Sequence, residues 1–325
     1  MLGLDDAESL GNDSELRQGD VPVSMHAQRL DRALSQLAPE FSRSYLQQLV
    51  EAGFARINGT VATKQSHKVK AGDTLQLELQ PTPQSKAFKP EAMDLDLVYQ
   101  DDHLMVINKP AGLVVHPAPG NWGGTLLNGL LALDPKIAEV PRAGIVHRLD
   151  KETSGLMVVA RSRLAMDALV RAIAARTVSR QYLALGHKSW SGAVTLTVQA
   201  PIGRDPRNRL RMAVVDLLKS PGKTARTDLI FLANSADACL VRCVLHTGRT
   251  HQIRVHMASI GHPLVADTVY GGSATEGMTR QALHAFRLAF DHPMTGEPLA
   301  FEARLPPDFQ ALLDSWGLRY NRAAG

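Results

Sequence analysis

Apolar residues near the start of the chain recur at intervals of three and four, which predicts two short helices. The first helix carries on one face Leu30, Ala33, Leu34 and Leu37. The second is expected to begin after Ser42, a residue type that caps helices, and to end at Gly53. Its apolar side is formed by Tyr45, Leu46, Leu49 and Val50.

Shorter alternations after Gly53 predict strands. The stretch FARINGTVATKQSHKVKAGDTLQLEL contains an Asn58-Gly59 pair, which is typical of a tight turn, and it ends in a strand with Leu75, Leu77 and Leu79. Helices and strands together predict a compact unit over residues 23–80. The segment QPTPQSKAFKPEAMD then holds three prolines among polar residues, so residues 81–95 are expected to form an extended linker.

Residues 96–318 consist mainly of apolar runs separated by polar turns, which predicts a sheet-rich domain. Two or three β-runs are expected in LDLVYQDDHLMVINKPAGLVVHP, and a strand, a polar loop and a strand in IVHRLDKETSGLMVVA. A helical period follows, with one face formed by Leu164, Ala168, Leu169, Ala172 and Ile173. Further strands are expected in QYLALGHK, GAVTLTVQAP, TARTDLIFLA and ACLVRCVLH. The pattern favours an α+β fold on a mixed, largely antiparallel sheet flanked by helices.

Composition is that of a globular protein. The 325 residues are 44% hydrophobic and 5% aromatic, which suits one large domain or two unequal ones. No run approaches the roughly 18 apolar residues of a membrane-spanning helix, and the acidic first residues have no signal-peptide core. We expect a cytoplasmic monomer without membrane contact. The two cysteines, Cys239 and Cys243, offer no disulfide framework and are expected to be reduced core residues.

The net charge of +4 conceals an uneven distribution. The first twenty residues contain six acids and one base, a charge of −5, which leaves +9 on the remainder. Residues 1–22 also lack hydrophobic periodicity, and we expect them to form a disordered acidic tail. Basic residues recur in every part of the remaining chain, which makes a nucleic acid the expected partner.

A dense group of polar residues lies between apolar flanks in HRLDKETSG, residues 147–155. Asp150 is there next to Lys151 and two residues from Arg148. Neighbouring cations would keep the carboxylate ionised, able to act as a nucleophile or a base. A surface ion pair is the alternative, and composition alone favours it. The signatures GxxxxGK[ST], GxGxxG, GxSxG and HExxH do not occur in the sequence, which lowers the weight of cofactor-driven and zinc-hydrolase functions.

Two further clusters are candidate binding sites. The stretch HTGRTHQIRVHMASIGHP holds four histidines, but no carboxylate or cysteine lies at ligand spacing, so we expect no metal there. IRVH is interpreted as a strand that places Arg254 and His256 on one face, with Arg254 directed at an anion or a carboxylate. The stretch RDPRNRLRM is an expected loop that would attract a polyanion, or else a solvated turn. Its arginines are Arg204, Arg207, Arg209 and Arg211.

The motif HRLDKETSGLMVVA resembles the active-site motif of the RNA pseudouridine synthases, in the branch named after ribosomal large-subunit synthase A. The resemblance extends in order to VYQDDHLMVINKPAGLVVHP, SRQYLAL, TGRTHQIRVHM with GHPLVADTVYGG, and QALHAFRLAFDHPMTGE. Residues 25–80 resemble the RNA-binding domain first seen in ribosomal protein S4. The resemblance implies a synthase domain preceded by a small S4-like domain, and it implies large-subunit ribosomal RNA as substrate, free or in the assembling subunit.

The same resemblance implies roles for individual residues. Asp150 would be the catalytic aspartate, Tyr182 would stack on the target base and assist proton removal, and Arg254 would pair with the aspartate. Leu283 would pack against the site, and Arg148 would fill the gap left by the flipped uridine. The further residues expected to contact RNA are His147 and Lys151 of the motif, the four arginines of RDPRNRLRM, and Arg32, Arg43, Lys64 and Lys68 of the first unit.

Isomerisation of uridine gains no atoms and changes no oxidation state, so the resemblance implies that no cofactor is needed. The alternative is a non-catalytic RNA-binding or ribosome-assembly factor that keeps the fold, and the presence of all four catalytic residue types argues against it. An RNA methyltransferase would need a glycine-rich cofactor loop after a strand, and the sequence has none.

Overall fold

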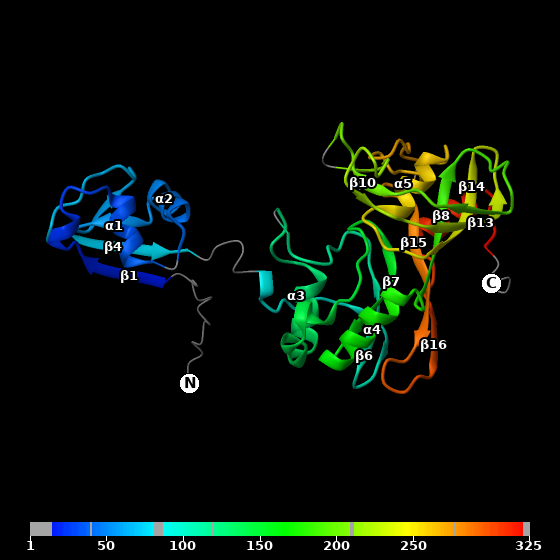
Figure 1. Ribbon diagram of the computed structural model, residues 1–325, viewed down its shortest axis with the longest axis horizontal. Coiled ribbons are helices and arrows are strands. Elements are labelled where there is room, and N and C mark those ends of the chain that lie inside the picture. The colour runs from blue at the N-terminus through cyan, green and yellow to red at the C-terminus, as the bar shows by residue number, and fades with distance from the viewer. Residues whose placement is uncertain are drawn as a thin grey trace, which may run out of the picture. The chain divides into compact units, whose positions relative to one another are not determined.

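The computed structural model describes residues 15–39, 41–80, 87–118, 120–208, 211–275 and 277–320. The chain divides into two compact units, Met1–Lys86 and Ala87–Gly325 (Figure 1). Each unit buries a hydrophobic core of its own, as an independent domain does. Within the described ranges, none of the helices has the length and apolar character needed to cross a membrane.

The first unit is a four-stranded antiparallel sheet with two helices. Its elements are β1 (Glu15–Asp20), the 3-10 turn η1 (Val23–Met25), α1 (Leu30–Leu37), α2 (Arg43–Glu51), β2 (Ala55–Ile57), β3 (Thr60–Ala62) and β4 (Thr74–Leu79). The strand order is β1-β4-β2-β3. Ser42 caps α2 by accepting the backbone N–H of Tyr45 at 3.3 Å. Asn58 and Gly59 both have positive φ in the turn between β2 and β3. The two predicted helices and the predicted hairpin are therefore confirmed.

The prediction that residues 1–22 form a disordered tail is wrong for residues 15–22. Glu15–Asp20 form β1, which pairs antiparallel with β4 over its whole length, and Val21 is buried. The sequence of β1 has no hydrophobic alternation because the strand lies at a sheet edge. Its backbone hydrogen bonds to β4 stabilise it without a buried face. The rest of the predicted tail, residues 1–14, lies outside the described residues.

The second unit is built on a nine-stranded sheet. Its strands are β5 (Asp96–Gln100), β6 (Leu104–Lys109), β7 (Ser154–Ala160), β8 (Ser179–His187), β9 (Thr195–Val198), β13 (Thr227–Asn234), β14 (Ala238–Leu245), β15 (Leu283–Asp291) and β16 (Pro298–Glu302). They lie in the order β5-β6-β7-β15-β8-β14-β13-β9, and β16 pairs with β15. Among the described strands of this sheet, β7 and β15 run parallel, and the other pairs are antiparallel. The predicted mixed, largely antiparallel sheet is confirmed.

Helices and a second, small sheet flank the large one. The helices are α3 (Leu126–Leu133), α4 (Arg163–Ala175), α5 (Gln252–Ser259) and α6 (Pro307–Ser315), with 3-10 turns η3 (Pro135–Glu139) and η4 (Pro141–Gly144). The small sheet has the order β11-β10-β12 and consists of β10 (Ile202–Arg204), β11 (Met212–Val214) and β12 (Gly222–Lys223). Its strand β11 packs against α5, and Figure 1 shows β10 and α5 in the same part of the unit.

The large sheet is buried on both faces. On β6, Met105 and Ile107 face the core that α3 covers, while Leu104 and Val106 face the core that α4 covers. A continuous apolar run is what such a doubly covered strand requires. The face predicted for α4 is wrong at Leu164, which is 69% exposed, because the buried face begins at Ala165.

The predicted linker is wrong for residues 87–95, which pack against α3. The side-chain amide of Asn128 donates to the carbonyl oxygen of Lys89 at 2.8 Å. The carboxylate of Glu91 accepts the backbone N–H of Gly124 at 2.7 Å. Asn128 of α3 and the backbone just before α3 thus fix a segment whose own composition suggests an extended chain. Residues 81–86 lie outside the described residues.

The stretch IRVH is helical and not a strand, because it lies inside α5. An alternation of four residues is too short to distinguish a strand from a helix. The side-chain oxygen of Gln252 accepts the backbone N–H of Arg249 at 3.0 Å and so satisfies a donor just before the first turn of α5. Two residues along a helix are separated by about 200°, so Arg254 and His256 point to opposite sides and not to one face.

Candidate active site

The polar loop at residues 147–153 connects η4 to β7. The strand expected before it is absent among the described residues, where Ile145 forms one isolated bridge with Val159. Gly155, the second residue of β7, follows the loop and has a φ of +120°. A Cβ there would lie 2.2 Å from the carbonyl oxygen of Ala285. Glycine at this position allows β7 and β15 to approach directly behind the loop.

Two buried cations hold the backbone just after Asp150. The Lys109 ammonium donates to the carbonyl oxygens of Pro110, Leu113 and Lys151 at 2.7, 2.9 and 3.0 Å. Burial lowers the pKa of Lys109 to about 7. Arg280 Nη1 donates to the carbonyl oxygen of Glu152 at 3.1 Å. The same guanidinium forms two hydrogen bonds to Asp308 of α6, so the loop is tied to distant parts of the fold.

The carboxylate of Asp150 meets a guanidinium that is already anchored. Arg254 Nε and Nη2 donate to the two carboxylate oxygens of Asp267 at 2.7 and 2.9 Å. Its remaining nitrogen, Nη1, lies 3.3 Å from Asp150 Oδ2. The side chains of Asp267 and Arg254 are 1% and 7% exposed, whereas that of Asp150 is 17% exposed. Arg254 is therefore fixed by one carboxylate and directed at the other.

An aromatic and an imidazole side chain complete this group. The guanidinium carbon of Arg254 lies 5.0 Å from the centre of the Tyr270 ring, a cation–π contact. The Tyr270 hydroxyl accepts the backbone N–H of Met212 at 3.0 Å, which leaves its own hydrogen for His251 Nδ1 at 2.8 Å. His251 Nε2 then faces Asp150 Oδ1 at 3.9 Å. Burial lowers the pKa of His251.

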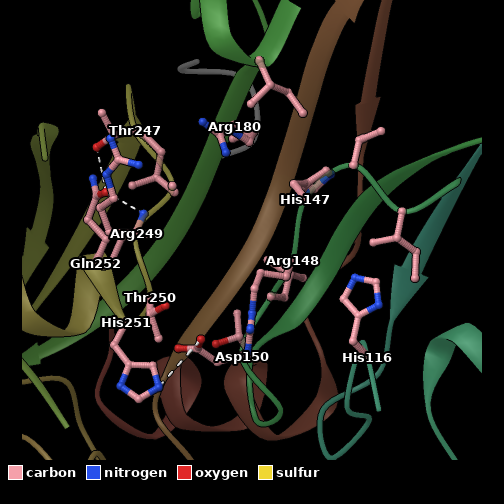
Figure 2. Close-up of a pocket in the computed structure, with 18 of the residues that line it drawn as sticks. His116, His147, Arg148, Asp150, Arg180, Thr247, Arg249, Thr250, His251 and Gln252 are labelled. Atoms are coloured by element: carbon pink, nitrogen blue, oxygen red, sulfur yellow. Dashed lines mark hydrogen bonds and ion pairs between the residues drawn. The ribbon is translucent and has the colours of Figure 1, made fainter. Parts of the chain in front are cut away.

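A cavity of about 670 Å³ opens in front of this group. Tyr182 on β8 and Leu283 at the start of β15 are buried side chains in its wall. Burial raises the pKa of Tyr182 to about 12. Arg148 is exposed and lines the same cavity, and Figure 2 shows it between Asp150 and the loop that carries His116. The structure thus brings together all four predicted catalytic residues and Arg148.

His147 and Lys151 of the same motif are also predicted to contact RNA, and their surroundings differ from those of Arg148. His147 Nε2 accepts the backbone N–H of Val158 at 3.1 Å. Burial, with the nearby charge of Arg180, lowers the pKa of His147 to about 3. A neutral imidazole therefore attaches the loop to β7, although His147 also lines the cavity. The side chain of Lys151 is exposed and lies outside the cavity wall. RNA contact by either residue stays a prediction.

The described arginines of RDPRNRLRM, which are Arg204, Arg207 and Arg211, do not line this cavity. Arg211 Nε donates to Asp205 at 2.7 Å, and its Nη1 donates to the carbonyl oxygen of Val269 at 3.3 Å. These bonds attach the small sheet to the segment that contains Asp267. Arg204 and Arg207 are exposed, and Arg209 lies outside the described residues.

The predicted basic residues of the first unit are exposed, and one of them binds a buried carboxylate. Asp31 is 0% exposed and accepts hydrogen bonds from Arg29, Arg43 and Gln47. The backbones of Arg29 and Lys68 form an isolated β-bridge. The exposed residues predicted to contact RNA are Arg32, Arg43, Lys64 and Lys68.

The four histidines of residues 246–262 are dispersed. His246 bonds to Asp228, His256 to Thr227 and the carbonyl oxygen of Ala200, and His262 to the carbonyl oxygen of His187. Each of these histidines, like His251, therefore has hydrogen-bond partners of its own. In the described ranges of the chain, histidine, cysteine and acidic side chains form no group of three or more that could hold a metal ion.

Sequence reasoning missed several residues of the site. Asp267 and Tyr270 lie in GHPLVADTVYGG, where an acid and an aromatic ring stand among small residues, and that contrast was the available signal. His251 was considered only as a metal ligand. Lys109 and Arg280 carried no signal, because the carbonyl oxygens that they bind belong to a loop about 40 and 130 residues away.

Comparison with known proteins supports one family. Residues 103–259 match the family described as RNA pseudouridylate synthase, and residues 28–75 match the S4 domain. A ribosomal large subunit pseudouridine synthase D of Neisseria meningitidis serogroup B is 48% identical over 90% of this chain and 80% of its own length. The protein of that name from Xanthomonas campestris is 46% identical over 96% of both chains. The structure of human RNA pseudouridylate synthase domain containing 1 aligns with a TM-score of 0.54 and 28% identity, over 69% of this chain and 89% of that one.

Fold, site and comparisons define a class of RNA-modifying enzyme. The chain belongs to the RNA pseudouridylate synthase family, and an S4 domain precedes the catalytic unit in the sequence. As a member it isomerises uridine to pseudouridine in RNA. This confirms the fold and the family that the sequence motifs predicted.

Proposed function

We propose that this chain converts specific uridines of large-subunit ribosomal RNA to pseudouridine. The two relatives named above carry that substrate in their names and are 46–48% identical over nearly the whole chain. The observation that carries the catalytic part is the contact of Asp150 with an anchored Arg254 at a cavity large enough for a nucleotide. We further propose that the enzyme acts as a monomer in the cytoplasm, on free ribosomal RNA or on the assembling subunit.

The reaction breaks the bond between ribose C1′ and uracil N1, turns the uracil, and joins C5 to C1′. N1 gains a proton and C5 loses one, so no atoms or electrons are exchanged with a cofactor. Asp150 acts either as a nucleophile at C1′ or as a base that triggers elimination in the ribose. In both cases the cavity retains the detached uracil while it turns.

Arg254 positions Asp150. A guanidinium has a rigid, planar set of donors, and two of the three nitrogens of Arg254 are bound to Asp267. The third nitrogen, Nη1, is thereby directed at Asp150. A lysine at position 254 would keep the charge and lose this direction.

Tyr182 and Leu283 form the wall against which the uracil turns. Because the pKa of Tyr182 is raised to about 12, its phenol is neutral near pH 7, with a deprotonated fraction on the order of 10⁻⁵. A neutral phenol is a weak base, so Asp150 is the better acceptor for the proton that leaves C5. Tyr182 contributes its ring face, which stacks on the base.

The target uridine has to leave its helix before it can enter the cavity. Unstacking and unpairing a base cost a few kcal/mol. Arg148, at the rim, offsets part of this cost by occupying the vacated position. Arg32, Arg43, Lys64 and Lys68 of the S4 domain bind phosphates of the surrounding RNA. Deletion of residues 1–80 should then lower both the affinity for ribosomal RNA and its dependence on salt.

Mapping of pseudouridines in large-subunit ribosomal RNA tests the substrate. Cells that lack the protein should lose pseudouridine at specific positions, and the wild-type chain should restore it. Asp150→Asn should restore none, and in vitro it should release no tritium from RNA labelled at uracil C5 while it still binds that RNA. An unchanged map in cells without the protein would refute ribosomal RNA as the substrate. Full restoration by Asp150→Asn would favour the non-catalytic assembly factor.

A further inference from the structure

Arg180 is a buried arginine that the reaction described above does not use. It is the second residue of β8 and is 6% exposed. Successive side chains on a strand point to opposite faces, so Arg180 and Tyr182 point to the same face, and both line the cavity. Two residues along a strand span about 6.6 Å. Arg180 is therefore the next side chain on this face of β8 after Tyr182, which forms part of the wall proposed for the uracil.

Among the described residues, no acidic side chain compensates the charge of Arg180. Its Nε is buried and has no hydrogen-bond partner in the same part of the chain. Its side chain forms no ion pair with a described carboxylate either. A buried charge without a partner is strongly destabilising. A purely structural side chain is not expected to carry such a charge, so a ligand is the expected partner.

The surroundings of Arg180 are strongly cationic. Asp150 is the one acidic residue among the described residues that line the cavity. The arginines that line it are Arg142, Arg148, Arg176, Arg180, Arg249 and Arg254. Figure 2 shows Arg180 between His147 on one side and the loop with Thr247 and Arg249 on the other. The partner is therefore an anion that enters from the open side of the cavity.

The backbone of this loop lies against the guanidinium of Arg180. A Cβ at Gly248 would lie 2.9 Å from Arg180 Nη1, closer than two such atoms normally approach. Glycine at position 248 thus leaves room for the guanidinium in the cavity wall, whereas a larger residue would displace it.

We propose that Arg180 binds a backbone phosphate that flanks the target uridine. A guanidinium matches a phosphate because both present two hydrogen-bonding positions in a fork. A base could not compensate the charge, since uracil is neutral, whereas the phosphates on either side of its ribose are anions that must accompany it. This inference rests on the proposed function, because it assumes that a uridine of an RNA chain enters the cavity.

A chemical double-mutant cycle tests the contact. The probe is a synthetic RNA hairpin that contains a uridine mapped as modified. Each of the two flanking phosphates is replaced in turn by a neutral methylphosphonate, and a 2′-O-methyl ribose 5′ of the linkage in every RNA prevents strand cleavage. The readout is the single-turnover rate of pseudouridine formation divided by the RNA concentration at half-saturation. Wild-type activity is measured first on the hairpin without any substitution, where its absence would count against the proposed function and not against Arg180, and then on the charged hairpin with the 2′-O-methyl groups, which is the reference for the two methylphosphonate hairpins.

Arg180→Gln should lower this ratio about 10- to 100-fold on the charged hairpin, as expected for a hydrogen bond to a charged group. On one of the two methylphosphonate hairpins the same substitution should have no effect. Arg180→Lys keeps the charge and loses the fork, so its loss should be smaller and should vanish on the same hairpin. Arg171→Gln, on the exposed side of α4, is the matched control and should change no ratio.

A structural role for Arg180 would give a different result. In that case Arg180→Gln would lower the midpoint of thermal unfolding and reduce the ratio equally on all three hairpins, which overturns the proposal. No reduction on the charged hairpin overturns it as well. The proposal instead expects an unfolding midpoint equal to or above that of the wild type, because the substitution removes an unpaired buried charge.

Discussion

Two buried aspartates each organise arginine side chains, one in the S4 domain and one in the catalytic unit, with different results. Asp31 is 0% exposed and binds Arg29 and Arg43, whose side chains remain 46% and 53% exposed. Asp267 is 1% exposed and binds Arg254, which is 7% exposed. The arginines held by Asp31 keep donors directed at solvent, whereas Arg254 is almost enclosed.

The difference shows that the burial of the arginine determines what the pair can do. Around Asp31, anchored arginines present charge outward, which suits an external polyanion such as RNA. Around Asp267, the enclosed arginine has one remaining nitrogen, and that nitrogen contacts Asp150. The same residue pair is therefore suited to recognition in one domain and to orientation of the proposed catalytic carboxylate in the other.

The largest effect is expected for Asp267→Asn. The substitution leaves the positive charge of Arg254 without its bidentate carboxylate, so the guanidinium should turn toward Asp150 and block it. The single-turnover rate should fall on the order of 10²- to 10³-fold, with RNA affinity unchanged. The free energy of unfolding should fall by about 3–5 kcal/mol, as followed by tryptophan fluorescence, because Trp122, Trp190 and Trp316 all lie in the catalytic unit. A rate near that of the wild type would contradict the positioning role of Asp267.

An arginine-to-lysine substitution should affect the group around Asp267 and the group around Asp31 differently. Arg254→Lys removes the fork and keeps the charge, so the single-turnover rate should fall about 10²-fold. Arg43→Lys keeps an outward charge, so RNA affinity and rate should stay within about twofold of the wild type. Equal losses in the two variants would mean that the burial of the arginine does not distinguish the clusters.

Acid should weaken the S4 domain through Asp31. Burial alone would raise the pKa of Asp31, but hydrogen bonds from Arg29, Gln47 and Arg43 outweigh it and lower the pKa from 3.8 to about 2. The folded state thus resists protonation, and the stabilising contribution is complete above pH 3.8 and lost as the pH falls through about 2. The slope is at most about 1.4 kcal/mol per pH unit.

Hydrogen exchange of residues 15–80 in the full chain measures this effect, since that range contains no tryptophan. Asp31→Asn should lower protection at pH 7 and remove the loss between pH 4 and pH 2. A variant that keeps the acid dependence would assign it to other carboxylates.

A small effect, limited to RNA binding, is expected for Arg43→Gln. Loss of one outward charge should weaken RNA binding by about two- to fivefold and reduce the slope of log affinity against log salt by about 1. The rate at saturating RNA should not change, because Arg43 belongs to the other unit. A lower saturated rate with an unchanged salt slope would argue against a phosphate contact.

Local pattern predicted most of the elements. The helices α1, α2 and α4, the Asn58-Gly59 turn and the strands β5 to β9, β13 and β14 follow from apolar spacing, caps and turn residues, whereas β15 and β16 were not predicted as strands. Two failures share a cause, because each segment is held by a distant partner. Glu15–Asp20 pair with β4, and residues 87–95 are bound by Asn128. IRVH lies inside α5 and was mistaken for a strand for a local reason, because an alternation of four residues is too short to distinguish the two.

The sequence by itself predicted which residues carry the chemistry. Motifs in a fixed order pointed to Asp150, Tyr182, Arg254 and Leu283, and the structure places these side chains around one cavity. Only the tertiary structure decided how they are held. Arg254 and Asp150 are 104 residues apart, and such a contact depends on which strands pair. The anchoring by Asp267, the cations behind the loop and the unpaired charge of Arg180 are relations between distant segments, and no local spacing encodes them.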